Sequence, residues 1–355
     1  MTAPLAGTTV VDTTNFLPGP YCSVTLADLG ARIISVEPPS GDPMRDYDMR
    51  IYRAVNHNKE TIRLDLKDPA DLDRLYVLVA GADVFLEGMR PGVAARLGTD
   101  YESMRGIKPD LVYCSISGYG QGGHLADAPG HDINYQSLSG TLSIPGHLGR
   151  PAQRAGLPIG DLAASMYSCI GILAALRLRD QTGEGSFLDV AIRDAMASWM
   201  PSRVGDEWIR SGAPDAHLEV NNDIFHGSDG VTFSVGAVEQ HFWTLLRDVV
   251  AQEQSEILDP RFDDRAGRRE HAAELRAIFE SVFDQRTGSE WLKTLRAAGV
   301  PVSPIYQASD VAADQALIDR GIVEQQGEGH FMRLPIVRDG SSWSVPFHPV
   351  AELDV

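Results

Sequence analysis

The stretch TTVVDTTNFLPGPYCSVTLADLGARIISVE, residues 8–37, decides the fold class of the chain. It predicts a strand at 8–12, a turn at Pro18-Gly19-Pro20, a helix that runs through Leu29, and a second strand at 32–37. Strands that alternate with helical stretches are typical of α/β domains with a largely parallel sheet. We therefore expect an α/β domain that begins with these residues.

The same alternation continues beyond residue 37. TIRLDL (61–66), DVFLEG (83–88) and LVYCSISG (111–118) have the β-rich composition of further strands. A helix is predicted over 69–80, because Asp68 is suited to the N-cap and Pro69 to the first helical position.

A long helix is predicted from Asp161 through LAASMYSCIGILAALRLRD. It is apolar nearly all round until its basic last turn, so we expect it to be buried. Gly183 and Gly185 mark its end, and SFLDVAI (186–192) has the composition of another strand.

A second domain is expected after the first, because 355 residues are too many for one small core. Residues 205–230 are rich in Gly, Pro, Asp and Asn and predict a link between the two. After it come a strand at VTFSVG (231–236), a helix from about Glu239, and helices near 271–285 and 288–298. We place the large α/β domain at 1–204 and a smaller α+β domain at 205–310.

Composition and charge exclude several classes of partner. The net charge of −18 repels nucleic acid and anionic membrane surfaces, so we expect neither as a partner. The N-terminus lacks the pattern of a secretory signal, and no apolar run reaches the length of a membrane span. The three cysteines, Cys22, Cys114 and Cys169, have no zinc-site spacing and predict buried free thiols. These features favour a cytoplasmic protein without a bound metal.

Two segments carry the most reactive side chains: PGHDINYQSLSG (129–140) and LPIGDLAAS (157–165). Each places an ionisable residue, His131 or Asp161, beside glycine at a predicted loop-to-helix boundary. An imidazole and a carboxylate close to unpaired helix N–H groups suit proton abstraction next to a carbonyl. The alternatives are that Asp161 only caps its helix and that His131 is structural.

Several motifs resemble the family III CoA-transferase superfamily (the CaiB/BaiF type). They are GPYCSVTLADLGARIISVEPPSGDPMR, NHNKETIRLDLKDP, DVFLEGMRPGVAARLG, LVYCSISGYGQGG and GVPVSPIYQASDVAAD. Within that superfamily, GHDINY and GAVEQHFW are similar to the α-methylacyl-CoA racemase group. The resemblance implies an enzyme that racemises 2-methylacyl-CoA thioesters by 1,1-proton transfer through an enolate-like intermediate. His131 and Asp161 would transfer the protons, with Asp132 and Glu239 as supporting carboxylates.

Two other functions remain open. In the transferases of the superfamily, the aspartate that matches Asp161 is a covalent nucleophile and needs no histidine partner. A non-catalytic relative with a binding or assembly role is the second alternative.

Coenzyme A is expected as part of the thioester substrate and not as a permanent cofactor. The resemblance gives Lys59 and Arg90 as phosphate contacts, with Arg45 and Arg53 as further candidates. Pro38 and Glu60 depart from the family pattern at positions that are commonly basic, and the usual C-terminal motif is absent. These departures leave an acyl group on a carrier protein as a possible substrate.

The resemblance also implies the architecture. A Rossmann-like large domain would be completed by a C-terminal segment, 311–355, that returns to it after the smaller α+β domain. The homodimer would be interlocked, and Glu239 of one chain would approach His131 of the other.

Overall fold

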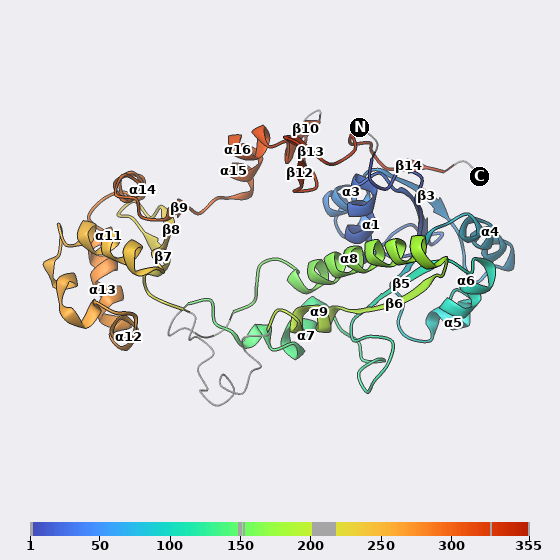
Figure 1. Cartoon of the computed structure of the whole chain (residues 1–355), viewed down its shortest axis with the longest axis horizontal. Helices are drawn as coiled ribbons and strands as arrows, with labels where there is room; N and C mark the ends of the chain where they lie inside the picture. The colour runs from blue at the N-terminus through green and yellow to red at the C-terminus, as the bar shows by residue number, and fades with distance from the viewer. Residues whose placement is uncertain (1–2, 148–150, 152, 201–217, 327–328, 354–355) are drawn as a thin grey trace. The chain divides into compact units, whose positions relative to one another are not determined.

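The structure is a computed structural model that describes residues 3–147, 151, 153–200, 218–326 and 329–353. It divides into two compact units (Figure 1). The first contains 1–141, 154–201 and 312–355, and the second contains 142–153 and 202–311. The prediction assigned 142–153 to the large domain, but this segment groups with the second unit. There, Nδ1 of His147 lies 2.5 Å from Oδ1 of Asp223.

A parallel β-sheet forms the centre of the first unit. Its strand order is β14-β3-β2-β1-β4-β5-β6, and every neighbouring pair is parallel. The strands are β1 (Thr9–Asp12), β2 (Arg32–Glu37), β3 (Lys59–Arg63), β4 (Val84–Glu87), β5 (Val112–Ser117), β6 (Ser186–Ala191) and β14 (Ala351–Glu352). The predicted α/β class with a parallel sheet is confirmed. Strand β3 ends at Arg63, before the predicted residue 66, because β2 ends at Glu37 directly opposite.

Side chains that alternate along the strands form a core on each face of the sheet. Val10, Ile33 and Val84 pack with α1 (Pro18–Asp28) and α8 (Ile159–Thr182) on one face. Val11, Ile34 and Phe85 pack with α4 (Pro69–Ala80) and α6 (Tyr101–Ile107) on the other. Figure 1 shows α8 running along β5 and β6 while α4 and α6 lie together. This two-sided burial follows from the period of two along a strand.

The remaining elements of the first unit are short, and most of them connect or edge the sheet. They are α2 (Met44–Tyr47), α3 (Met49–Asn56), α5 (Val93–Leu97), α7 (Asp132–Leu138), α9 (Ile192–Ala197), α16 (Gln315–Asp319), and two hairpins, β10 (Val323–Gln326) with β11 (Gly329–Met332) and β12 (Val337–Arg338) with β13 (Ser341–Ser342). Helix α4 begins and ends as predicted, and the side chain of its N-cap, Asp68, accepts from the N–H of Ala70.

Helix α8 departs from its predicted burial. Half of its most apolar window is buried, and by length and composition alone the helix is apolar enough to cross a membrane. Its buried side packs into the core of the sheet, which is the ordinary place for such a helix in a globular domain. Its other side is exposed and apolar, with Ile170 at 58% and Leu178 at 50% exposure. The sequence could not predict this difference, because apolar residues occur on both sides.

The second unit has a three-stranded antiparallel sheet and its own aromatic core. Its elements are β7 (Asn222–His226), β8 (Thr232–Gly236), β9 (Val302–Pro304), α11 (Gln240–Val250), α12 (Arg265–Glu270), α13 (Ala272–Phe283) and α14 (Gly288–Ala297), with α15 (Ala308–Ala312) where the chain leaves it. Strand β7 lies in the stretch predicted as a link, 205–230. The first part of that stretch lies outside the described residues, and the second is fixed by pairing with β8.

Candidate active site

A cleft of about 1170 Å³ opens at the carboxyl ends of the strands in the first unit. Residues that directly follow β1, β4 and β5 line it, among them Thr13, Gly88 and Gly118. The strand order reverses between β1 and β4, and open parallel sheets bind their ligands at the carboxyl edge beside such a point. The topology therefore makes this cleft the candidate site.

Asp161 lies in the first turn of α8 and lines the cleft. Among the described residues, none donates a hydrogen bond to its carboxylate or forms an ion pair with it. Burial raises its pKa to about 7, and the nearby negative charge of Asp132 adds to the effect. The cleft thus holds a carboxyl group that changes its charge near neutral pH.

Asp132, at the start of α7, is buried and fixes the first turn of α8. Its Oδ1 accepts from the N–H of Gly160 at 2.8 Å and from the N–H of Asp161 at 3.4 Å. A Cβ on residue 160 would lie 2.9 Å from that oxygen, so glycine permits the approach. The sequence had predicted unpaired helix N–H groups beside Asp161, suited to proton abstraction next to a carbonyl. That expectation is wrong for this structure, because Asp132 already occupies them.

His131 is the exposed N-cap of α7, and it lines the same cleft as Asp161. Its backbone N–H donates to Oδ1 of Asn134 at 3.0 Å, which closes the first turn of the helix. The structure therefore brings both predicted proton-transfer residues to one cleft.

Tyr135 also lines the cleft, although the sequence had not singled it out. Its hydroxyl donates to the carbonyl of Gly130 at 2.6 Å, and its ring packs edge-on against Tyr119. Burial, together with the charge of Asp161, raises the pKa of Tyr135 to about 12. The only signal for it was its place in the GHDINY motif.

Glu239 lies in the second unit, where it is exposed at the N-cap of α11. Its predicted support of His131 across a dimer is not tested by this single chain.

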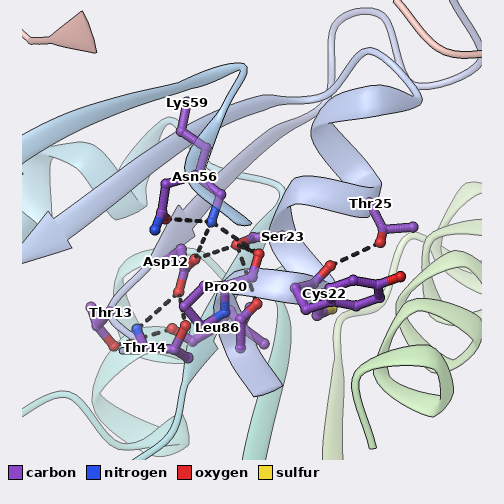
Figure 2. Close-up of polar contacts among 12 residues, drawn as sticks. Asp12, Thr13, Thr14, Pro20, Cys22, Ser23, Thr25, Asn56, Lys59 and Leu86 are labelled. Atoms are coloured by element: carbon purple, nitrogen blue, oxygen red, sulfur yellow. Dashed lines mark hydrogen bonds and ion pairs between the residues drawn. The ribbon is translucent and has the colours of Figure 1, made fainter. Parts of the chain in front are cut away.

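Lys59 is not available to a phosphate. Its side chain has no exposed surface, and its ammonium donates to the carbonyl of Pro20 at 3.0 Å and to Oδ1 of Asn56 at 2.9 Å (Figure 2). Oδ2 of Asp12 lies 3.8 Å away. The predicted phosphate contact is therefore wrong, and the physical reason is burial, which the family motif does not reveal.

Arg45 and Arg53 do not line the cleft either. Arg45 forms an ion pair with Glu37 at 2.7 Å. Burial alone would raise the pKa of Glu37, but hydrogen bonds from Arg45 and Tyr52 outweigh it and lower that pKa. Arg53 is exposed in the last turn of α3. Neither structural position supports the predicted phosphate contacts.

Three other cations do line the cleft: Lys67, Arg90 and Arg154. All three are exposed, and no described residue forms an ion pair with them. Arg90 was predicted, whereas Lys67 and Arg154 were missed because nothing in their local sequence separates them from solvated surface residues. They are cationic groups on a cleft wall that also carries carboxylates, and they can contact an anionic ligand.

Comparisons with known proteins identify the family and agree with this fold. The sequence model of CoA-transferase family III matches residues 5–347. This chain belongs to CoA-transferase family III. It is 34% identical to the acetyl-CoA:oxalate CoA-transferase of Acetobacter aceti over 323 residues, which cover 87% of this chain and 82% of the relative. It is 30% identical to the human succinyl-CoA:glutarate CoA-transferase over 335 residues, or 90% and 76% of the two chains.

A solved structure supports the same family. The CaiB/BaiF family protein from Brucella suis matches with a TM-score of 0.86 and 29% identity, covering 96% of this chain and 94% of that one. The predicted superfamily is thus confirmed. The finer prediction of a racemase is not supported, because the curated relatives named above are CoA-transferases, and they favour the alternative that the sequence had left second.

Proposed function

We propose that this protein transfers coenzyme A from an acyl-CoA to a free carboxylic acid, with Asp161 as the covalent nucleophile. The observation that carries the proposal is the carboxylate of Asp161 on the cleft wall, with no counter-ion among the described residues. A nucleophile must be free to reach the thioester carbonyl, and an ion pair would reduce its reactivity.

The reaction starts when an oxygen of Asp161 attacks the thioester carbon. The C–S bond breaks, the electron pair leaves with the CoA thiolate, and an acyl-aspartyl anhydride forms. The thiolate then attacks the γ-carbon of Asp161, which releases the donor acid and leaves an aspartyl-CoA thioester. The acceptor carboxylate attacks the γ-carbon of this thioester, the C–S bond breaks, and an aspartyl–acceptor anhydride forms. The released thiolate attacks the acceptor's carbonyl carbon, and the bond from that carbon to the Asp161 oxygen breaks. Asp161 is regenerated, and no metal or redox group enters this scheme.

The substrate would enter as an anion. Lys67, Arg90 and Arg154 are the cleft cations that would hold the phosphates of CoA or a second carboxylate of the acid. The relatives are named for oxalate and glutarate, so we propose a dicarboxylic acid as the acceptor class. A carrier-bound acyl group is the competing substrate, and we place the reaction in the cytoplasm.

The test is a transfer assay with the purified protein. Acetyl-CoA or succinyl-CoA is incubated with a panel of dicarboxylic acids, and the new thioesters are identified by mass. Transfer that requires Asp161 supports the proposal. Absence of transfer from any donor, together with no binding of acyl-CoA, would instead indicate a non-catalytic relative.

A second candidate is racemisation, favoured by the presence of His131 in the same cleft as Asp161. One residue would remove the α-proton of a 2-methylacyl-CoA and the other would return a proton to the opposite face. Deuterium uptake from D2O at the α-carbon tests it. Uptake that requires both His131 and Asp161 would favour racemisation over transfer.

We also propose a homodimer. The exposed apolar side of α8, which includes Tyr167, Ile170, Leu173 and Leu178, is a surface that a second copy could cover. Light scattering measures the mass in solution, and Ile170→Lys should shift a dimer towards monomer. A wild-type monomer at micromolar concentration would contradict this proposal.

A further inference from the structure

The pair Lys59–Asp12 lies next to one wall of the cleft, because Asp12 directly precedes the lining residues Thr13 and Thr14. Both side chains are fully buried. Oδ1 of Asp12 accepts from the N–H and the hydroxyl of Thr14, at 2.8 and 2.5 Å, and Oδ2 accepts from the hydroxyl of Ser23. Figure 2 shows the Lys59 ammonium among Asp12, Asn56 and Pro20. The pair therefore ties β1 and α1 to the end of α3.

The wall next to this pair consists of the loop 13–17 and the first two residues of α1, all of which line the cleft. Asp12 holds Thr14, and the carboxylate of Asp42 accepts from the N–H of Phe16. Phe16 has a φ of 61°, an uncommon conformation for a bulky side chain, so its neighbours must hold it there. This loop therefore has a shape that its own sequence does not favour.

The loop is also connected to the turn of Asp161. The hydroxyl of Ser165 lies 2.6 Å from the carbonyl of Pro18 and 2.8 Å from the carbonyl of Asp161, and it can donate to either. Ser165 is fully buried. A displacement of the loop and of Pro18 after it would therefore change the contacts of the Ser165 hydroxyl with the first turn of α8.

A buried cation is expensive for the fold. Removing an ammonium from water generally outweighs its attraction to one carboxylate, and apolar residues of similar volume often replace buried ion pairs without loss of stability. Stability alone therefore does not account for a lysine at this position. The buried charge pair instead holds the residues of the cleft wall in one geometry.

We propose that Lys59 and Asp12 are positioning residues, whose buried charge pair holds the wall loop 13–17 in the conformation that receives acyl-CoA. This inference rests on the proposed function, because it takes the cleft to be the acyl-CoA site. Neither residue touches the substrate; both act through the loop.

The pair should make ligand binding sensitive to alkaline pH. The charged and titratable groups that face Lys59 are Asp12 on β1, Glu37 at the end of β2, Asp42 in the loop before α2, and Cys22 on α1. Burial lowers the pKa of Lys59 to about 8, although these groups oppose the change. Above that pH, the Lys59 side chain is neutral and Asp12 loses its counter-ion, so the loop is held less firmly.

The experiment measures the Kd of acetyl-CoA by calorimetry from about pH 6.5 to about pH 9.5, across the titration of Lys59. All proteins carry Asp161→Asn, which keeps the ligand intact and removes the titration of Asp161. We expect the Kd of this parent to rise about tenfold at the alkaline end, because small displacements of a binding wall are costly. Lys59→Met should bind about tenfold more weakly at pH 7 and show no alkaline change.

Two variants separate positioning from a general loss of fold. Asp12→Asn removes the counter-ion, so Lys59 should lose its proton at lower pH. The rise in the Kd of acetyl-CoA should then begin at a lower pH than in the parent. Lys108→Met removes an exposed lysine that pairs with Asp110 outside the cleft, and should leave the profile unchanged. Circular dichroism and thermal unfolding verify each fold.

The outcomes are distinct. A parent that binds acetyl-CoA equally at all pH values overturns this inference and leaves the proposed function standing, even if Lys59→Met does not fold. Equal affinity in folded Lys59→Met and its parent overturns it as well. A parent that binds neither acetyl-CoA nor succinyl-CoA at any pH overturns the proposed function itself.

Discussion

Two aspartates near helix N-termini at the cleft, Asp12 below α1 and Asp161 in α8, have contrasting surroundings. Below α1, Asp12 accepts from Thr14 and Ser23 and lies beside the Lys59 ammonium. At the start of α8, Asp161 has no donor and no counter-ion among the described residues, and it has a second negative charge, Asp132, nearby. The same residue type thus occupies opposite electrostatic environments, on the cleft wall at Asp161 and buried next to that wall at Asp12.

The difference indicates how the chain separates structure from chemistry. A carboxylate that accepts several hydrogen bonds, such as Asp12, holds the backbone in place. A carboxylate without such partners is a candidate for reaction, because no structural contact fixes its charge or reduces its reactivity. Four predictions follow from this contrast, in order of decreasing effect.

Replacement of the free carboxylate should have the largest effect. Asp161→Asn is expected to reduce the rate of CoA transfer by at least about a thousandfold, because an amide cannot form the anhydride. Asp12→Asn, at the satisfied carboxylate, should retain transfer within about tenfold at pH 7. Steady-state kinetics on both variants measures the contrast. Equal losses would contradict it.

Removal of the negative charge of Asp132 should change the pH dependence of kcat/KM for CoA transfer. Asp161 must be ionised to attack, and its pKa is raised to about 7, so kcat/KM should rise as the pH increases through 7. Asp132→Asn removes a negative neighbour and should move this limb to lower pH, by on the order of one unit. Ser137→Ala, on the exposed side of the same helix, is a matched control and should not move it.

The buried lysine should be detectable in stability. Because the folded-state pKa of Lys59 is about 8, below the ordinary 10.5, the unfolded chain binds more protons between these values. The wild type should therefore gain stability relative to Lys59→Met as the pH rises from 8 to 10.5, by on the order of 2–3 kcal/mol. Urea unfolding at several pH values measures the difference, and a constant difference would show that folding does not lower the pKa of Lys59.

The smallest effect is expected at His131. In the transfer mechanism no step requires an imidazole, so His131→Ala should change kcat by no more than about fivefold. We expect neither the wild type nor His131→Ala to exchange the α-proton of the acyl group with D2O above background. A decrease in kcat of more than a hundredfold in His131→Ala would contradict this prediction and favour proton transfer as the main chemistry.

Much of the sheet unit could be predicted from sequence. The run 32–37 became β2 without change, and Asp68 and Pro69 fixed the start of α4, because short-range capping and strand composition act locally. Strand β7 could not be predicted, because its short sequence between turn residues is stabilised by pairing with β8.

The candidate site was predicted in part. His131, Asp161 and Arg90 do line one cleft. Lys59 was mistaken for a ligand contact because exposure depends on how α1 and α3 pack over it, and no local pattern encodes that. The use of the α8 N–H groups by Asp132 was also out of reach, since it joins residues 28 positions apart.

The most direct test of the account is to trap the intermediate on Asp161. The protein is incubated with acetyl-CoA, quenched, treated with hydroxylamine or borohydride, and digested, and the peptide that contains Asp161 is analysed by mass spectrometry. We predict a hydroxamate or a reduced side chain at Asp161 that depends on the thioester and is absent in Asp161→Asn. An unmodified Asp161 peptide from protein that is transferring CoA would contradict the account.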